Sequence, residues 1–512
     1  MALNSTGTID VESGTLNLYG SGTNSGTINV ASGAILAMSG GTYWFGTNSW
    51  FTGTGDCEMG QCSVFGRLQG TTPFSVVYDV TFNTELASGT MIWDYQDGNQ
   101  SGPLTIDSNA VYNIGSGCNV YGAMTNFGKI IYPAGSPTGS WSWGSPARLE
   151  NRPGGIIDLQ ADLRFYDGTD VPFKNAGTLL KSGGTGESII DPGFGFTNTG
   201  TIKVQSGTLD LSGMTSSNAI IIGAGAAVCL DSGNYCLGPT NTFTGPGVLA
   251  LNLYASPAPP VILGPLSGSA GFQMDGDAYF TNCILGGTLT WINGTMDGIL
   301  TVGTSGALVM LNPETMAGSI TNLGKITFNP AGTNCGVLGT FSALSVGGNY
   351  IQGSGGALDM GVGGRSTSHF DQLNITGKAI LNGLLLVHLF NGFPPASSDS
   401  FQLLTYGSHN GDFSPLSLPG GTALTYAATD AQLVVNHPMV VQPMFLHPGI
   451  AAGKMTFGVW TANGTNYTLS RSDSLIPANW TTITNYTGDG NFWTFTLSMP
   501  SVPSRFYRIS QP

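Results

Sequence analysis

The chain has 512 residues, of which 41% are hydrophobic and only 9% charged, with 78 glycines and a net charge of −14. This hydrophobic content can form a core and excludes a disordered chain, and the lack of any basic run excludes a nucleic-acid partner. No apolar stretch reaches the roughly 20 residues of a membrane-spanning helix, and the glycines follow no three-residue period, which excludes collagen.

The N-terminal part of the chain is built from a short repeat. Residues 6–20 read TGTIDVESGTLNLYG, and residues 198–213 read NTGTIKVQSGTLDLSG. In both, two short runs with alternating aliphatic residues flank a Ser-Gly corner, so we expect the aliphatic side chains to face inward and Lys203 and Asp210 to face outward. Asn-x-Gly corners recur roughly every 20 to 23 residues, which is typical of β-helix coils. The sequence therefore predicts an all-β fold that begins with a parallel β-solenoid over residues 1–345.

A longer repeat overlies the short one. GTMIW from Gly89 matches GTLTW from Gly287, and TNFGKIIYPAG matches TNLGKITFNPAG further along the chain. The matching segments lie about 195 residues apart, so a unit of this length is duplicated and its second copy is cut short. Duplication suits an architecture in which each layer contacts only its neighbours. Trp93 and Trp291 occupy the same repeat position, which favours a packing role for both.

Two further segments follow the repeats. Residues 346–437 contain longer alternating runs separated by turn residues, which predicts a β-rich closing unit with hairpins. Residues 438–449 form a proline-rich linker. Residues 450–512 have the short aromatic-rich strands expected of a small β-sandwich.

Several of these segments resemble a known class of proteins. FKNAGTLLKSGG, FTNTGTIKVQSGTLDLSG and GGTLTWINGTMDG resemble the low-charge β-helix repeats of bacterial surface and secreted proteins, such as autotransporter passenger domains. The segment from Gly347 to Val435 resembles the unit that often closes such passengers. YTLSRSDSLIPANWTTI with RFYRIS resembles a small C-terminal module of secreted bacterial proteins. The resemblance implies a parallel β-helix and a secreted, cell-surface location, and it implies no catalytic residue.

The acidic residues allow an enzymatic alternative. No histidine precedes His369, so a histidine-assisted nucleophile cannot lie wholly within the predicted solenoid. A glycoside hydrolase, however, needs only two suitably separated carboxylates. The candidates are Asp94, Asp97, Asp158 and Asp162. We favour the competing interpretation, that these are ordinary turn and surface residues, because Asp-Gly is a common turn pair.

Aromatic residues are stronger candidates for a binding role, because flat rings stack on sugar rings. In GSWSWGSP, Trp141 and Trp143 lie two residues apart and so share one face of a strand. Packing inside the coil is the alternative for both. Tyr166 is a third candidate for glycan contact. Asp275 and Asp277 in MDGDAY could hold calcium, with a simple turn as the alternative; no other cofactor is indicated.

The cysteines bear on the cellular compartment. Of the seven, Cys57 with Cys62 and Cys229 with Cys236 are close enough in sequence to form loop disulfides. Such bridges suit an oxidising, extracellular setting. Free buried thiols are the alternative, and the spacings, with no histidine nearby, do not favour a metal site.

Together these patterns favour a non-enzymatic, extracellular structural or adhesive surface protein. Its stiff solenoid rod would contact a polysaccharide, a cell-surface glycan or copies of itself in a filament. Repeat sequence begins within the first ten residues without a signal-peptide pattern, so we expect a removed leader or a longer parent chain; an uncovered solenoid end favours self-assembly. The alternative is a secreted β-helix glycoside hydrolase that uses two carboxylates.

Overall fold

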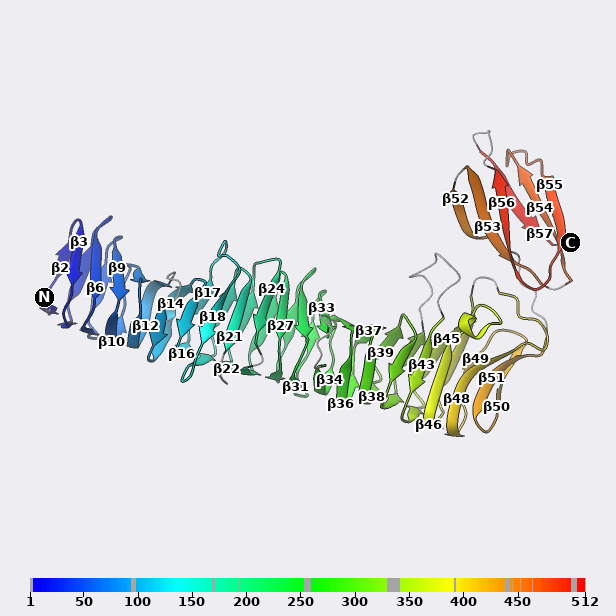
Figure 1. The fold of residues 1–512 in the computed structure, drawn as a ribbon, viewed down its shortest axis with the longest axis horizontal. Helices are drawn as coiled ribbons and strands as arrows, with labels where there is room; N and C mark the ends of the chain where they lie inside the picture. The colour runs from blue at the N-terminus through cyan, green and yellow to red at the C-terminus, as the bar shows by residue number, and fades with distance from the viewer. Residues whose placement is uncertain are drawn as a thin grey trace. The chain divides into compact units, whose positions relative to one another are not determined.

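The computed structural model is almost entirely β-structure, with 62% of residues in strands and 1% in helix. It describes residues 3–93, 98–167, 171–191, 193–252, 259–328, 341–390, 393–437, 443, 445–451, 453–462, 464–498 and 504–511. A parallel β-solenoid of about 15 turns is followed by further sheets at the C-terminus (Figure 1). The predicted fold class is therefore confirmed. The chain divides into two compact units, Met1–Cys283 and Ile284–Pro512.

In the first coils, each turn of the chain adds one strand to each of three parallel sheets. The first sheet pairs β1 (Leu3–Ser5), β4 (Gly22–Asn24), β7 (Thr42–Phe45) and β10 (Cys62–Leu68). The second sheet pairs β2 (Ile9–Val11), β5 (Thr27–Val30) and β8 (Trp50–Thr52). The third sheet pairs β3 (Thr15–Leu18), β6 (Ile35–Ser39), β9 (Asp56–Gly60) and β11 (Phe74–Val76).

Two longer strands, β12 (Val80–Trp93) and β14 (Leu104–Ile114), with the short β13 (Asn99–Ser101) between them, then rearrange the coil. Val80 of β12 pairs with β13, whereas Thr84 of the same strand pairs with β14, so that one sheet continues as two. Trp93 at the end of β12 is fully buried, and so is Trp291 at the matching repeat position. The packing role predicted for both tryptophans is confirmed.

After this point the coils have three faces, named here in chain order. The first face contains β16 (Ala123–Asn126), β19 (Arg148–Asn151), β22 (Val171–Asn175), β25 (Phe194–Asn198), β28 (Met214–Ser216), β31 (Asn234–Leu237) and β34 (Val261–Leu266). The second face contains β17 (Lys129–Tyr132), β20 (Ile156–Leu159), β23 (Thr178–Lys181), β26 (Thr201–Val204), β29 (Ile220–Ile222) and β32 (Phe243–Thr244). The third face contains β15 (Cys118–Val120), β18 (Gly139–Trp143), β21 (Leu163–Asp167), β24 (Glu187–Ile190), β27 (Thr208–Leu211), β30 (Ala227–Leu230), β33 (Val248–Leu251) and β35 (Gly271–Asp275). β36 (Ala278–Leu285) follows these strands.

Aliphatic side chains form continuous ladders inside the coils. On the second face, one ladder runs through Ile130, Ile157, Leu179, Ile202 and Ile220, each paired in register with the next and none exposed. Strand alternation explains this, because every second side chain points into the coil. Burying such a side chain stabilises the fold by roughly 1.5 to 3 kcal/mol. Each strand of the second face thus contributes one buried aliphatic side chain to this ladder.

Corner asparagines form a second, polar ladder. The side-chain amides of Asn126, Asn151, Asn175 and Asn198 are buried, and each of the first three donates from Nδ2 to the Oδ1 of the next at 2.7 to 2.8 Å. The first three also donate to a backbone carbonyl of the following coil at 3.1 to 3.2 Å. Buried polar groups need such partners. These hydrogen bonds explain why asparagine recurs at this corner from Asn126 to Asn198.

Glycine is needed where one coil lies directly on the next. Gly102 has φ +72°, and a Cβ built on it would lie 1.9 Å from the carbonyl oxygen of Phe82 in the preceding coil. Neither the conformation nor the contact allows a side chain. This explains part of the high glycine content.

The second unit continues with parallel pairing. Its coils contain β37 (Thr288–Asn293), β38 (Thr295–Val302), β39 (Ala307–Met310), β40 (Glu314–Met316), β41 (Ser319–Asn322), β42 (Lys325–Phe328), β43 (Ala343–Val346), β44 (Tyr350–Gln352), β45 (Ala357–Val362), β46 (Gln372–Ile380), β47 (Leu384–Leu389), β48 (Ser400–Asn410) and β49 (Leu416–Ser417). A single 3-10 turn, Thr367–His369, lies between β45 and β46.

The solenoid ends with a hairpin. β50 (Thr422–Tyr426) and β51 (Asp430–Val435) pair antiparallel, and β51 also pairs antiparallel with β48. The domain boundary predicted between residues 345 and 346 falls inside β43. Parallel pairing continues across it, from β43 to β46 and on to β48. Of the predicted linker, residues 438–442 and 444 lie outside the described residues.

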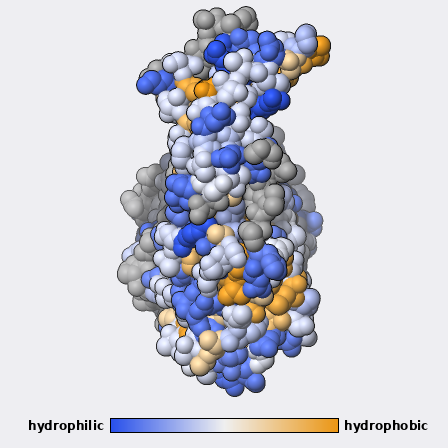
Figure 2. Space-filling model, turned by 90° about the vertical axis from the view of Figure 1, so that its right-hand side faces the viewer, coloured by the Kyte–Doolittle hydropathy of each residue, from blue (hydrophilic) through white to orange (hydrophobic). Residues whose placement is uncertain are grey.

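The C-terminal segment forms two antiparallel three-stranded sheets. One contains β52 (Leu446–Ala451), β53 (Lys454–Trp460) and β56 (Phe492–Ser498), and the other contains β54 (Asn466–Ser472), β55 (Thr481–Thr487) and β57 (Phe506–Ser510). Phe457, Val459 and Leu469 form the buried core of this small sandwich. Its Ile476 is 92% exposed, and Figure 2 shows apolar residues exposed in small groups on a largely hydrophilic surface.

Candidate functional site

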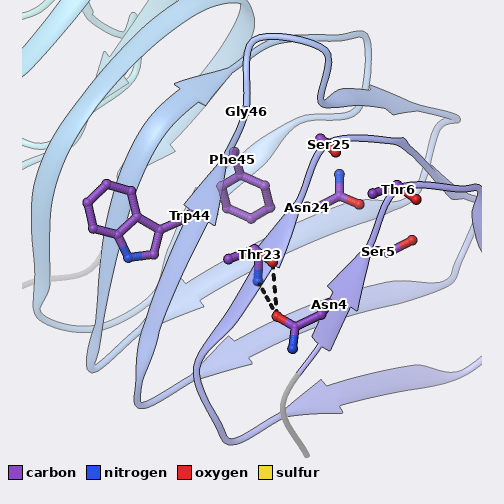
Figure 3. Close-up of a pocket in the computed structure, with 9 residues that line it drawn as sticks. All are labelled: Asn4, Ser5, Thr6, Thr23, Asn24, Ser25, Trp44, Phe45 and Gly46. Carbon is purple, nitrogen blue, oxygen red and sulfur yellow. Dashed lines mark hydrogen bonds between the residues drawn. The ribbon is translucent and has the colours of Figure 1, made fainter.

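A groove with an aromatic wall lies on the outer side of β1, β4 and β7. Asn4 pairs with Thr23, and Thr23 pairs with Trp44, so these three side chains form a row across successive coils. Figure 3 shows Thr23 between Asn4 and Trp44. The groove is open and has a volume of about 410 Å³. Because neighbouring strands lie about 4.8 Å apart, the row spans roughly 10 Å.

Trp44 is the wall of this groove because of the strand alternation in β7. Tyr43 and Phe45 point into the coil and are buried, which turns Trp44 outward, where it is 52% exposed. Its ring stacks on Phe65 of β10 in the next coil, with centroids 4.4 Å apart and planes at 17°. One face of the indole is thus covered, and the ring lies at the end of the row formed by Asn4 and Thr23.

The remaining lining is polar but uncharged. The groove is lined by Asn4, Ser5, Thr6, Thr23, Asn24, Ser25, Trp44, Phe45 and Gly46, none of which is ionisable. Asn4 Oδ1 accepts hydrogen bonds from the backbone nitrogen and the hydroxyl of Thr23, at 3.2 and 2.9 Å, which fixes both side chains (Figure 3). An aromatic plane beside hydroxyl and amide groups suits a neutral sugar ring.

The tryptophans proposed for sugar contact lie inside the coil instead. Trp141 and Trp143 share one face of β18, as predicted, but that face is the inner one, and both are buried. Trp141 donates from Nε1 to Gly115 O at 2.8 Å and packs edge-on against Tyr132 and Phe165. The glycan-contact prediction for this pair is wrong, because alternation defines two sides of a strand without saying which is inside.

Tyr166 is exposed on the outer side of the third face. Its side chain is 50% exposed, and the Arg164 guanidinium lies 5.9 Å from the ring centroid. Tyr166 therefore stays a candidate for contact with a ligand.

Two of the four predicted carboxylates lie within the described residues, and both have hydrogen-bond partners. Asp158 lies on the second face, where it accepts hydrogen bonds from Gln160 and Ser182. Asp162 lies at the corner before β21; its Oδ1 accepts from Lys181 Nζ at 2.7 Å and its Oδ2 from Gly186 N at 2.9 Å. Asp94 and Asp97 lie outside the described residues.

The proposed calcium residues are exposed at a turn. Asp275 and Asp277 flank Gly276, and the backbone carbonyl of Asp277 accepts a hydrogen bond from Asn252 at 2.8 Å. Within the described part of the chain, no group of three or more His, Cys, Asp or Glu side chains could hold a metal ion.

The predicted disulfides are not formed in this structure. Cys57 and Cys62 are both buried free thiols, on β9 and β10, and burial raises the pKa of Cys62 to about 11. Cys229 is buried on β30, whereas Cys236 on β31 is an exposed free thiol. In both pairs, the two cysteines lie on different faces of the coil, and close spacing in sequence does not bring them together.

Charged groups on the second and third faces form a further cluster that the sequence did not point to as a site. Lys181 occupies an inward position of β23 and is fully buried, with Nζ bonded to Asp162, Gly183 O and Ser188 Oγ. Asp210 faces outward, as predicted, yet is only 7% exposed. Burial, reinforced by the charge of Glu187, raises the pKa of Asp210 to about 7. The only signal in the sequence was a lysine at an aliphatic ladder position.

Comparison with known proteins does not assign the chain to a family. No family model matches the chain, and no curated protein is significantly similar to it. Among the described residues, none belongs to a helix long and apolar enough to cross a membrane.

Proposed function

We propose that this chain is an extracellular structural and adhesive surface protein whose β-solenoid binds glycans in the groove beside Trp44. The observation that carries the proposal is the half-exposed indole of Trp44, held in place by Phe65 and lying beside a row of uncharged polar side chains. A ring that is held before the ligand arrives loses little conformational freedom on binding.

Several further properties support this proposal. Only 9% of the residues are charged, and the sequence is rich in Ser, Thr and Asn, whose side chains form hydrogen bonds with sugar hydroxyls. The resemblance of the repeats to those of autotransporter passengers supports secretion to the cell surface. The edge strands of a solenoid also favour contact between copies of the chain, so self-assembly belongs to the proposal.

Binding to immobilised cellulose, galactomannan and xylan tests the proposal. We expect at least one of these neutral polysaccharides to retain the protein, and Trp44→Ala to weaken retention by roughly tenfold, because stacking on the indole is lost. Trp50→Ala is the matched control, since Trp50 is 43% exposed and lies outside the groove. Equal loss in both variants, or no binding to any of the three, would refute the proposal.

The hydrolase alternative stays a prediction. Of its candidates, Asp162 has both oxygens occupied by hydrogen bonds, which favours a positioning role over proton transfer. Release of reducing ends from the same polysaccharides, abolished by Asp162→Asn, would favour the hydrolase.

A further inference from the structure

A second groove lies on the third face, some coils away from Trp44. It is open, has a volume of about 490 Å³, and lies over β18, β21 and β24. Its lining includes the hydroxyls of Thr138 and Ser140, the carboxylates of Asp162 and Glu187, and the guanidinium of Arg164. Unlike the Trp44 groove, this groove is lined by charged groups.

The two cations beside this groove are already matched by carboxylates. Arg164 Nε lies 3.0 Å from both oxygens of Asp191, and its Nη2 lies 2.8 Å from one of them. The buried ammonium of Lys181 lies 2.7 Å from Asp162. Within the described part of the chain, Glu187 has no ion-pair partner. The groove therefore has an excess of negative charge at Glu187.

Asp210 is an independent sign that a positive group is missing here. Asp210 is 93% buried. Neither Asp210 Oδ1 nor Glu187 Oε1 has a hydrogen-bond partner among the described residues. Asp210 pairs across the sheet with Ile189, which lines the groove. The nearby charges of Glu187, Asp231 and Asp191 disfavour its ionisation, and only Arg164 among the named charges favours it. A cation seated at Glu187 would offset the repulsion between the Glu187 and Asp210 carboxylates.

We propose that this groove binds the protonated amine of an amino-sugar unit, with Glu187 as the direct partner of the ammonium. Thr138 and Ser140 supply hydroxyls for the sugar, and Tyr166, on the same outer side of β21 as Arg164, supplies an exposed ring. The choice of a sugar over a small polyamine rests on the proposed function. Recognition of the amine does not depend on Trp44.

Two oligosaccharides with the same sugar backbone, one with charged amines and one with neutral acetamides, test this inference. We expect glucosamine hexamer, at a pH at which its amines are protonated, to bind the full chain, and N-acetylglucosamine hexamer to bind at least about tenfold more weakly, because the ion pair is absent. Added salt should weaken only the first interaction. Equal binding of the two hexamers would overturn the inference without any variant being needed.

Variants then locate the site. Glu187→Gln should lower affinity for glucosamine hexamer about tenfold, whereas Glu12→Gln, the same change at an exposed turn residue, should not. The comparison of the two hexamers repeated in a Trp44→Ala background should give the same tenfold difference, so failure of the Trp44 groove is distinguished from failure of this one. Spermidine that binds as tightly as the hexamer, with the same dependence on Glu187, would overturn the assignment to an amino sugar.

Discussion

Replacing Asn151 by alanine removes one rung of the buried asparagine ladder. Asn151 Nδ2 donates to Asn175 Oδ1 at 2.7 Å and to Thr178 O at 3.1 Å, and Asn151 Oδ1 accepts from Asn126 Nδ2 at 2.8 Å. Each hydrogen bond contributes about 0.5 to 1.5 kcal/mol. Loss of all three therefore lowers the free energy of unfolding by about 1.5 to 4.5 kcal/mol.

Urea unfolding of the full chain, followed by far-UV circular dichroism, measures this loss. Asn83→Ala is the control, because Asn83 is exposed on the outer side of β12, and a surface change of this kind stays within about 0.5 kcal/mol. Because solenoid coils unfold with their neighbours, the loss should move the midpoint of the main transition. A loss below about 1 kcal/mol for Asn151→Ala would refute the account of the ladder.

Two further predictions concern the buried acid and the coil contacts. The raised pKa of Asp210 means that the folded state binds its proton more tightly than the unfolded state, so its contribution to stability is complete at low pH and is lost as pH rises from 3.8 to about 7. Asp210→Asn should therefore be more stable than the parent above pH 7, by up to about 4 kcal/mol, and equally stable below pH 4 in pH-dependent melting; a stabilisation that grows toward low pH would contradict this. Gly102→Ala should cost clearly more stability than Gly154→Ala, since both have positive φ but only Gly102 would place its Cβ against a backbone oxygen; equal melting temperatures would exclude the steric argument.

Strand alternation and corner spacing were enough to predict the solenoid. The aliphatic residues of the 198–213 repeat, such as Ile202 and Leu209, are fully buried, as the period of two requires. The corner asparagines were recognised only as a spacing signal. That Asn151 and its equivalents stack on one another follows from the parallel register, which the sequence does not state.

The binding groove was missed because its residues come from different coils. TYWF in β7 contains three consecutive aromatics, and only the position of the core decides that Trp44 is the one turned outward. The same ambiguity placed Trp141 and Trp143 on the wrong side of their strand. The charged groove was missed for the same reason. Asp162 and Glu187 come from neighbouring coils and line one groove only after the coils have stacked.

A structure of the chain bound to an oligosaccharide of the tightest-binding neutral polysaccharide tests the central claim most directly. We predict a pyranose ring stacked on the free face of the Trp44 indole, with hydroxyls bonded to Thr23 and Asn4. A sugar bound elsewhere on the solenoid, with the Trp44 groove empty, would contradict the account.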